Sequence, residues 1–315
     1  MKKTAGRPVE GIANRNKRFG FRKNLPLYLM FSPVIVYLFV FRIFPIIYSL
    51  FLSTVSYKPM KGVFGSKFVG IKYYAQFFKS VFFWRLIRNT LAINALQLTI
   101  GFVIPIILAL LLNEVTHSKY KKLVQSVTYL PNLISSVVVV SILVQILSPN
   151  GLVNSFLHHM GKKDTIYFFT EPSYFWFIFT AMTIWQGAGR SAIIYLAAIT
   201  GIDSELYEAA ALDGAGRLQQ VFKITLPCLM PTIVILFLMA VGRILDVGYD
   251  SILLMYNESI YSTADVIGTY IYRAGVLDGN YSYTSAVGFF QSIMGLLMVI
   301  GANKLSKKFT ESSLW

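Results

Sequence analysis

The sequence contains few charged residues and a single cysteine. Asp, Glu, Lys and Arg make up 14% of the chain, against roughly 25% in an ordinary globular domain. Because Cys228 is the one thiol, an internal disulfide is excluded, and no Cys/His cluster has metal-ligand spacing. A Gly-x-x-x-x-Gly-Lys-Ser/Thr segment is also missing, so this chain cannot hold the phosphates of a nucleotide in a P-loop.

Apolar residues are correspondingly abundant. They make up 55% of the 315 residues, and the mean hydropathy is +0.59. A soluble protein of this size could not remove so much apolar surface from water, whereas a lipid bilayer does so directly. Because a chain of this kind crosses lipid as helices, the sequence predicts an all-α polytopic membrane protein with one membrane domain.

The apolar runs set the number of crossings. A hydrocarbon core about 30 Å thick requires about 20 helical residues. Six stretches have this length: Leu27–Leu52, Asn89–Asn113, Val124–Leu147, Ser173–Ala198, Leu229–Val247 and Ser282–Ala302. The predicted organisation is a basic tail over residues 1–26, a six-span domain over 27–303 and a second tail over 304–315.

The formal net charge of +15 does not indicate a nucleic-acid partner, because the basic residues lie mostly in tails and short loops. They are concentrated on one side of the predicted spans: in the first tail, in the loop after span two, in the loop after span four and in the last tail. The positive-inside rule therefore predicts that both termini are cytoplasmic. The opposite loops, 53–84, 148–172 and 248–281, are rich in aromatic residues, which suits either an interfacial belt or a docking surface for an external partner.

The loop between spans four and five, residues 201–227, is longer than a simple connection requires. Asp203 or Ser204 can cap a helix that contains Glu205 and Glu208 in its first turns. Gly214 and Gly216 can end that helix and turn the chain, and a second short helix is expected to run toward Ile224. A helix-turn-helix that projects from the membrane suits insertion into a groove on a soluble partner, more than it suits lying flat on anionic headgroups.

This loop resembles the EAA loop of ABC importer permeases, which reads Glu-Ala-Ala, three residues, Gly, nine residues, Ile-x-Leu-Pro. All seven positions match: Glu208, Ala209, Ala210, Gly214, Ile224, Leu226 and Pro227. The resemblance extends over about Leu27–Trp315 to the sugar-type permeases of the MalF/UgpA-like superfamily. Within that superfamily the sequence is most similar to the LplB-like group, which is associated with oligosaccharide and polysaccharide uptake.

The resemblance implies a type I ABC importer permease fold in the bacterial cytoplasmic membrane. It implies a heterodimer with a second homologous permease, two ATPase subunits that bind ATP and Mg²⁺, and an external solute-binding protein that delivers an oligosaccharide. This chain is expected to bind no cofactor and to be no enzyme. Closure of the ATPases is expected to move the helix that contains Glu208 and Gly214 and so to open the sugar path alternately to either side.

Polar residues inside spans are costly and are therefore candidates for the sugar path. The candidates are Asn132, Gln145, Trp185, Gln186, Arg190, Tyr195, Arg243 and Asp246. Amide and aromatic side chains suit the hydroxyl groups and C–H faces of sugars. Gly187 and Gly189 are expected to loosen span four. Arg243 and Asp246, three residues apart, could instead form an ion pair on one helical face.

Two other functions fit a multispan protein. An ion-driven secondary transporter is expected to have inverted repeats and buried acidic residues, but no repeat is visible, and Asp246 is the one plausible buried carboxylate. An intramembrane enzyme would need catalytic residues within the spans, yet His117, His158 and His159 all lie between spans.

Overall fold

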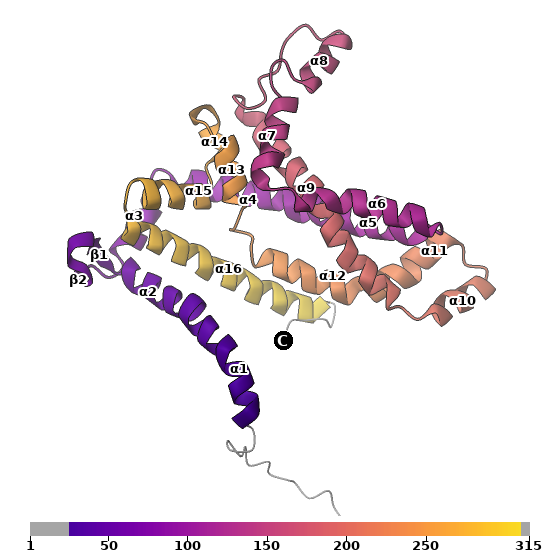
Figure 1. Ribbon diagram of the computed structural model, residues 1–315, viewed down its shortest axis with the longest axis horizontal. Helices are drawn as coiled ribbons and strands as arrows, with labels where there is room; N and C mark the ends of the chain where they lie inside the picture. The colour runs from indigo at the N-terminus through magenta and orange to yellow at the C-terminus, as the bar shows by residue number, and fades with distance from the viewer. Residues whose placement is uncertain (1–24, 310–315) are drawn as a thin grey trace, which may run out of the picture. The chain divides into compact units, whose positions relative to one another are not determined.

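The computed structural model describes residues 25–309, so most of the predicted basic tail and the end of the carboxyl tail lie outside the described residues. The chain divides into two compact units, Met1–Ser49 and Leu50–Trp315. The secondary structure of the second unit is almost wholly helical (Figure 1).

The described part of the first unit is one continuous helix that passes into the second. It consists of α1 (Leu25–Leu38), a π-helical turn (Phe39–Ile43) and α2 (Phe44–Ser53). The wide turn ends at Ile43, two residues before Pro45, whose nitrogen cannot donate to the Phe41 carbonyl within that turn. Within residues 25–49 no side chain is buried, and apolar side chains exposed all around a helix require a lipid or protein environment.

The second unit begins with a short antiparallel hairpin. Strands β1 (Val55–Lys58) and β2 (Gly62–Phe68) pair Val55 with Phe68 and Ser56 with Lys67, and the register shifts before Lys58 pairs with Gly62. A 3₁₀ turn, Pro59–Lys61, joins the strands. Helix α3 (Lys72–Phe78) follows.

A long helix then runs from α4 (Phe83–Leu96) through a π-helical turn (Gln97–Gly101) into α5 (Phe102–Glu114). Pro105 lies four residues after the end of this turn, and its nitrogen cannot donate to the Gly101 carbonyl. This helix contains the predicted second span and extends it by two turns at the amino end.

The predicted third span, Val124–Leu147, is not one straight helix. Helix α6 (Ser118–Tyr129) and the 3₁₀ turn Leu130–Leu133 meet α7 (Ser136–Ile146) at an angle of 99°. Pro131 lies in the turn, and Ser135 caps α7 by accepting a hydrogen bond from the Val138 amide at 3.5 Å. A break in a helix leaves carbonyl groups free, and Gln186 donates to that of Ile134 at 3.1 Å. The stretch predicted as span three therefore consists of two helices that meet at a bend.

The connection after α7 forms a projecting segment with the short helix α8 (Leu152–His159) (Figure 1). Helix α9 (Pro172–Thr200) then continues for 29 residues without interruption. Gly187 and Gly189 do not loosen it. Gly189 instead permits close packing, because a Cβ at this position would overlap the backbone of Thr128 and Tyr129 on α6.

Helix α10 (Ser204–Leu212) is followed by a turn and then by a helix longer than the sequence predicted. This helix consists of α11 (Arg217–Gln220), a π-helical turn (Val221–Thr225) and α12 (Leu226–Val241). The loop therefore has no separate second helix. The helix predicted as span five begins at Arg217 and not at Leu229. The wide turn precedes Pro227 and accommodates its missing donor.

The remaining elements are α13 (Tyr249–Met255), a 3₁₀ turn (Glu258–Ile260), α14 (Tyr261–Ala264), α15 (Ile267–Ile271), a π-helical turn (Tyr272–Leu277) and α16 (Tyr281–Phe309). Helix α16 packs against α12 and α3, and α14 packs against α9.

Among the described residues, four helices are long and apolar enough to cross a membrane, and the bent pair α6–α7 makes a fifth if it counts as one span. The four are Leu25–Ser53, Phe83–Glu114, Arg217–Val241 and Tyr281–Lys308. Helix α9, predicted as span four, is not among them, because Gln186 and Arg190 near its middle interrupt its apolar sequence.

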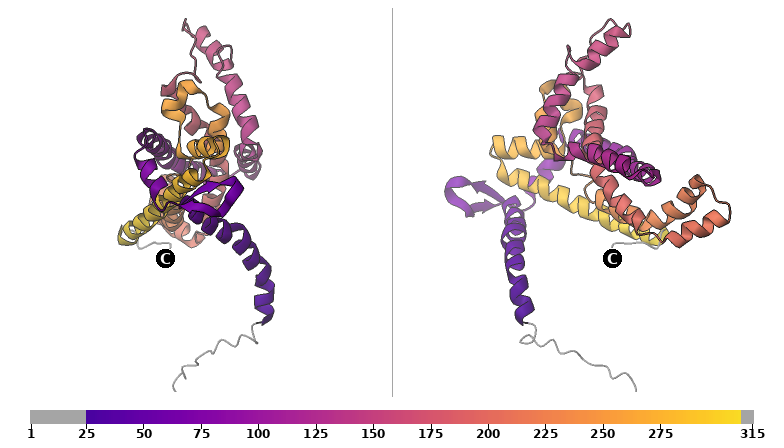
Figure 2. Two further views of the ribbon diagram at one scale, coloured as in Figure 1. Left: turned by 90° about the vertical axis from the view of Figure 1, so that its left-hand side faces the viewer. Right: turned by 45° about the vertical axis from the view of Figure 1, so that its right-hand side comes forward.

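Three buried apolar clusters hold the second unit together. One joins α7, α9 and α13 around Phe179 and Ile252. A second joins α3, α4, α15 and α16 around Phe77 and Ile267, and a third joins α5, α9 and α12 around Leu229. Helix α9 takes part in two of the three, so this partly polar helix is fixed by packing on several sides (Figure 2).

Candidate functional site

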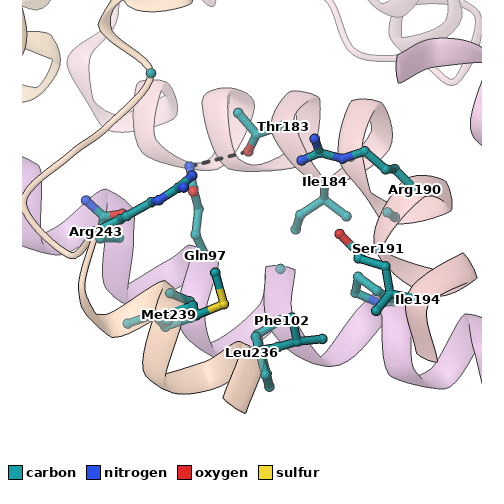
Figure 3. A pocket seen from close by; sticks show the side chains of 18 of the residues that line it. Gln97, Phe102, Thr183, Ile184, Arg190, Ser191, Ile194, Leu236, Met239 and Arg243 are labelled. Carbon is teal, nitrogen blue, oxygen red and sulfur yellow. Dashed lines mark hydrogen bonds between the residues drawn. The ribbon is translucent and has the colours of Figure 1, made fainter. Parts of the chain in front are cut away.

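A pocket of about 700 Å³ lies where the middle of the second long helix, the middle of α9 and the end of α12 meet (Figure 3). Helix α4 and the following turn contribute Asn94 and Gln97, and α9 contributes Thr183 and Ser191. Aromatic groups come from Phe102 and Tyr195, and charged groups from Arg190, Arg243 and Asp246. This volume lies within the 300–1,000 Å³ that ligand sites occupy.

The polar groups of this central pocket form few bonds with one another. Gln97 donates to Thr183 at the limit of 3.5 Å, and Asn94 donates to the Thr90 carbonyl at 3.0 Å. Arg190 and Arg243 are exposed, and within residues 25–309 neither has a carboxylate within 4.0 Å. Amides, hydroxyls and two unpaired guanidiniums beside aromatic rings can bind a polyhydroxylated ligand that carries negative charge.

Four of the eight candidates for the sugar path line this pocket: Arg190, Tyr195, Arg243 and Asp246. The other four lie elsewhere. Trp185 is 52% exposed on α9, Gln145 is exposed near the end of α7, Asn132 lies in the 3₁₀ turn before α7, and Gln186 holds the bend at Ile134.

Arg243 and Asp246 do not form the ion pair considered from their spacing. Helix α12 ends at Val241, and both residues lie in the turns that follow, where the Asp246 amide donates to the Arg243 carbonyl at 2.8 Å. Asp246 is also exposed, so its description as a buried carboxylate was wrong. Conversely, the sequence reasoning missed Asn94, Gln97 and Thr183. The two amides in the second predicted span were a usable signal, because intramembrane polar groups are costly.

The segment between α9 and α12 contains all seven residues of the Glu-Ala-Ala pattern. The Asp203 side chain caps α10 by accepting a hydrogen bond from the Glu205 amide at 3.0 Å, which resolves the choice between Asp203 and Ser204. At the other end Gly214 has φ +78°, a left-handed conformation that favours glycine. The Ala215 amide donates to the Ala210 carbonyl at 2.8 Å and closes the helix end.

The return of the chain is fixed by side-chain bonds. The Tyr207 and Thr225 hydroxyls lie 2.9 Å apart and tie α10 to the wide turn before Pro227. Gln219 accepts a hydrogen bond from the Gly216 amide at 3.1 Å, and Gln220 donates to the Ala215 carbonyl at 3.3 Å. These bonds hold the two helices and the turn together, and Glu208 lies exposed on the first helix.

Large apolar side chains are exposed on this same segment. Leu212 is 90% exposed, Leu218 74% and Phe222 65%. Large apolar side chains exposed in this way are typical of a surface that a partner protein or lipid covers.

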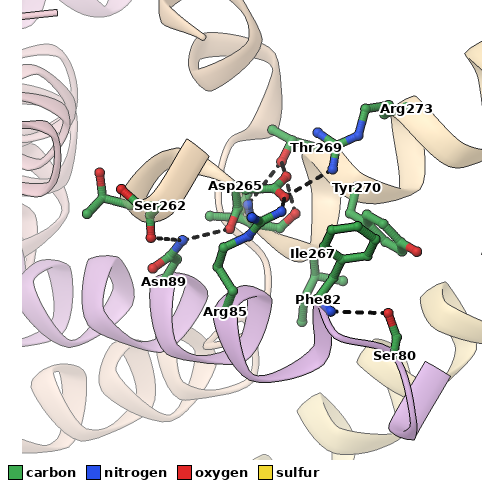
Figure 4. A network of polar contacts seen from close by, with 12 residues as sticks. Ser80, Phe82, Arg85, Asn89, Ser262, Asp265, Ile267, Thr269, Tyr270 and Arg273 are labelled. Carbon is green, nitrogen blue, oxygen red and sulfur yellow. Dashed lines mark hydrogen bonds and ion pairs between the residues drawn. The ribbon is translucent and has the colours of Figure 1, made fainter. Parts of the chain in front are cut away.

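A second polar cluster, which the sequence reasoning did not predict, surrounds Asp265 (Figure 4). This carboxylate is completely buried and accepts hydrogen bonds from Arg85 at 2.6 Å and Arg273 at 3.0 Å. Its other oxygen accepts from Tyr256 at 2.7 Å and Thr269 at 3.2 Å. We refer to Asp265, Arg85 and Arg273 as the ionic brace, since it ties α4 to the segment α13–α15.

The protonation of the brace follows from its surroundings. Burial, together with the neighbouring charge and hydrogen bond of Asp265, raises the pKa of Tyr256 well above 10.0. Burial acts to lower the pKa of Arg273, but the hydrogen bond and charge of Asp265 outweigh it and raise that pKa. Tyr256 therefore remains a neutral donor and Arg273 a cation at physiological pH.

Asn89 and Thr90 extend the attachment of α4. The Asn89 amide donates to the carbonyls of Asp265 at 2.9 Å and Ser262 at 3.1 Å, and Thr90 accepts from the Ile267 amide at 3.2 Å. Both side chains are completely buried, so the polar residues at the start of the second predicted span are structural.

Comparison with known proteins places this architecture in context. The profile of the family described as "Binding-protein-dependent transport system inner membrane component" matches residues 101–310. The polygalacturonan/rhamnogalacturonan transport system permease protein YteP of Bacillus subtilis (strain 168) is 40% identical over 292 residues, which cover 92% of this chain and 90% of YteP. Protein LplB of the same organism is 36% identical over 313 residues, covering 99% and 96%.

Two solved structures share the fold. A chain of a bacterial alginate ABC transporter, in complex with a periplasmic protein bound to an alginate pentasaccharide, is 39% identical with a TM-score of 0.86. The alignment covers 94% of this chain and 99% of that one. A chain of a bacterial ABC transporter involved in the import of the acidic polysaccharide alginate is 40% identical with a TM-score of 0.84, covering 92% and 98%.

Proposed function

The chain belongs to the family of binding-protein-dependent transport system inner membrane components, and from this membership we propose that it carries an acidic oligosaccharide through the central pocket by alternating access. It is the permease component of a sugar ABC importer. The driving force comes from separate ATPase subunits that bind the exposed residues Glu208, Leu212, Leu218 and Phe222, which we call the coupling surface. The observation that carries the proposal is that the two helices adjoining this surface in the chain also line the pocket.

Two helices connect the coupling surface to the central pocket. Helix α9 lines the pocket from Thr183 to Tyr195 and ends at Thr200, a few residues before α10 begins. The helix that starts at Arg217 runs without a break to Val241 and lines the pocket with Leu236, Met239 and Ala240. A displacement of α10 is therefore transmitted to two walls of the pocket at once. Such a connection converts closure of the ATPase subunits into a change in the side of the membrane to which the pocket is open.

The coupling surface supports a partner-bound role. Its exposed leucines and phenylalanine suit a hydrophobic groove, the Glu208 carboxylate suits a basic group on the partner, and small Ala209 and Ala210 permit close approach. Ile224, Leu226 and Pro227 belong to the wide turn and the start of α12. There they set the angle at which the coupling segment leaves the membrane helix.

The side chains that line the central pocket indicate the chemical class of the cargo. Amide and hydroxyl groups suit sugar hydroxyls, and Phe102 and Tyr195 suit the C–H face of a pyranose ring. Arg190 and Arg243, which have no carboxylate within 4.0 Å in the described part of the chain, suit the carboxylates of uronate units. The polysaccharides named for the alginate transporter and for YteP are compatible with this charge.

The assembly is a heterodimer with a second homologous permease, two ATPases that bind ATP and Mg²⁺, and an external solute-binding protein. This chain itself is no enzyme. Six crossings of the bacterial cytoplasmic membrane, with α9 as the fourth and both termini in the cytoplasm, bring the coupling surface to the ATPase side. Because α9 lines the pocket and packs against several neighbours, its polar middle faces protein and substrate instead of lipid.

The ion-driven alternative receives no support from the buried carboxylate. Asp265 is engaged by two arginines, a tyrosine and a threonine, so it offers no vacant site to a coupling ion.

The coupling proposal is tested by paired substitutions in the reconstituted transporter. Glu208→Gln should weaken ATPase attachment and uncouple hydrolysis from uptake, whereas Glu205→Gln, which removes an exposed carboxylate from the same helix, should leave both near wild type. Gly214→Ala forces a Cβ into the left-handed region at a cost of about 1–2 kcal/mol. Gly216→Ala, at φ −69° with open space around it, is its control.

Sugar uptake and sugar-dependent ATP hydrolysis are the measurements, with co-purification of the ATPase as the assembly check. Normal coupled uptake and normal ATPase attachment in both Glu208→Gln and Gly214→Ala would refute the coupling role.

A further inference from the structure

A second pocket, of about 470 Å³, lies at the amino end of α4, away from the residues of the central pocket. Helix α4 contributes Trp84, Arg85 and Arg88. The segment from the 3₁₀ turn into α14 contributes Glu258, Ser259, Tyr261 and Ser262. These residues lie in the outward-facing part of the chain under the proposed topology. We refer to this cavity as the outer pocket.

Its two guanidiniums are fixed before any ligand arrives. Arg85 bonds Asp265 at 2.6 Å and lies over the ring of Phe82 at 5.0 Å. Arg88 donates to the Ser262 carbonyl at 2.6 Å and to the Asn89 side chain at 3.2 Å. Side chains held in place by such bonds lose little conformational entropy on binding a ligand.

Positive charge in this region exceeds what the protein neutralises. The oxygens of Asp265 are already occupied by Arg85, Arg273, Tyr256 and Thr269. Arg88 is exposed, and within residues 25–309 it has no carboxylate within 4.0 Å. Glu258 lines the same pocket, but it too forms no ion pair in the described part of the chain. An anion can therefore bind Arg88 without breaking an existing ion pair.

One donor also lacks a partner. The Nε atom of Arg85 is buried and has no hydrogen-bond acceptor among the described residues. Buried polar atoms are normally hydrogen-bonded, so this orphaned donor marks a place where an acceptor is missing.

The aromatic groups make the outer pocket unlike a simple anion site. Trp84 lines it with an indole that is 76% exposed. Tyr261 is stacked on Tyr256 with ring centroids 4.2 Å apart, and Arg273 lies 5.1 Å above it. An interfacial aromatic belt would account for Trp84, but it would not require two immobilised guanidiniums beside it. A flat indole next to paired guanidiniums suits a sugar ring that bears a carboxylate.

We propose that the outer pocket is a second sugar subsite that binds the carboxylate of a uronate unit through Arg85 and Arg88, while Trp84 stacks on the sugar ring. This inference rests on the proposed function, since it assumes an acidic oligosaccharide as cargo. Arg88 and Gln97 lie on the same long helix, nine residues apart, or about 13 Å along its axis. One oligosaccharide can therefore leave the outer pocket while its leading end enters the central pocket.

The test uses the assembled transporter in lipid nanodiscs, without the binding protein. The probes are trigalacturonate and its fully methyl-esterified form, which has the same rings but no carboxylate charge. Equilibrium binding is measured for wild type and for Arg88→Gln, Arg88→Lys, Trp84→Ala and Trp84→Phe. Lys72→Gln, which removes an exposed cation before α4, is the matched control.

Wild type should bind the acid form at least tenfold more tightly than the ester. Arg88→Gln should reduce this preference about tenfold, as expected for the loss of one charge-assisted hydrogen bond, and Arg88→Lys should retain part of it. Trp84→Ala should weaken both forms, whereas Trp84→Phe should retain most of the affinity. Lys72→Gln should match wild type, and basal ATP hydrolysis of every variant checks assembly.

Two results overturn the subsite. One is an unchanged acid-over-ester preference in Arg88→Gln. The other is unchanged sugar binding accompanied by weaker stimulation of ATP hydrolysis by the binding protein, which would assign these residues to protein docking. Both leave the proposed function standing, because wild type would still take up the acidic oligosaccharide. Failure of wild type to bind or take up the acid form refutes the proposed cargo and the subsite together.

Discussion

Replacement of Asp265 by asparagine should destabilise the protein strongly, because it removes the one negative charge of the ionic brace. Asparagine has nearly the same shape, so the loss is electrostatic. Its amide group would also face the donors of Arg85 or of Tyr256. Removing one partner of a buried ion pair costs about 3–5 kcal/mol.

The expected value lies toward the lower end of that range. The side chains of Arg85 and Arg273 are 30% and 25% exposed, so water can partly solvate them once Asp265 is neutral. A loss of about 3 kcal/mol corresponds to a fall of about 6–12 °C in the unfolding midpoint, at about 2–4 °C per kcal/mol. Thermal unfolding of the purified transporter in nanodiscs measures this shift.

The control is Asp278→Asn, which neutralises an exposed carboxylate in the same segment. Its midpoint should stay within about 2 °C of wild type, as surface substitutions generally do. A midpoint for Asp265→Asn equal to that of Asp278→Asn would refute the reasoning.

A double-mutant cycle separates charge from packing. Arg273→Gln should destabilise wild type, but it should cost much less in the Asp265→Asn background, where Arg273 is one of two uncompensated cations. A coupling energy of about 1–3 kcal/mol is expected for residues in one network. Additive effects would show that the brace stabilises by shape alone.

Three further predictions concern other parts of the molecule. Gly189→Ala should destabilise the packing of α9 on α6 by about 1–3 kcal/mol through overpacking, whereas Gly187→Ala, with open space around its Cβ, should be neutral in the same thermal assay. Asn154→Leu should speed hydrogen exchange at the Ile166 amide, which donates to the Asn154 side chain at 2.9 Å; unchanged exchange would contradict this assignment. Stability should fall as pH rises above about 10, because the unfolded chain releases the Tyr256 proton there while burial raises the pKa of this residue in the folded state. Tyr256→Phe should reduce that dependence, and identical pH profiles would argue against it.

Residue types and their spacing along the chain were sufficient for the broad class and for the two ends of helix α10. The apolar composition excluded a soluble fold, and the pattern from Glu208 to Pro227 identified the family. The local signals were also informative: Asp203 caps its helix and Gly214 ends it, as their residue types predicted. These features depend on neighbours within a few residues, so the sequence contains them completely.

Helix continuity was harder to predict. Pro131 and Pro227 each follow a leucine in an apolar stretch of sequence, yet the chain bends by 99° near the first and continues as a helix through the second. The two sites differ in a tertiary contact at the point where the helix breaks. At the bend, Gln186 of another helix supplies a hydrogen bond to Ile134, and no local pattern encodes that contact.

The sequence by itself determined that this protein lies in a membrane, that residues 1–315 contain no P-loop segment, and that the pattern from Glu208 to Pro227 matches the permease family. Tertiary structure alone decided which polar residues meet. It assembled Asn94, Gln97, Arg190 and Arg243 into one pocket, left Asp246 exposed, and buried Asp265 between two arginines, one of them 180 positions away. The physical reason is that a buried charge is stable only beside its partners. The fold brings those partners together in space from positions far apart in the sequence.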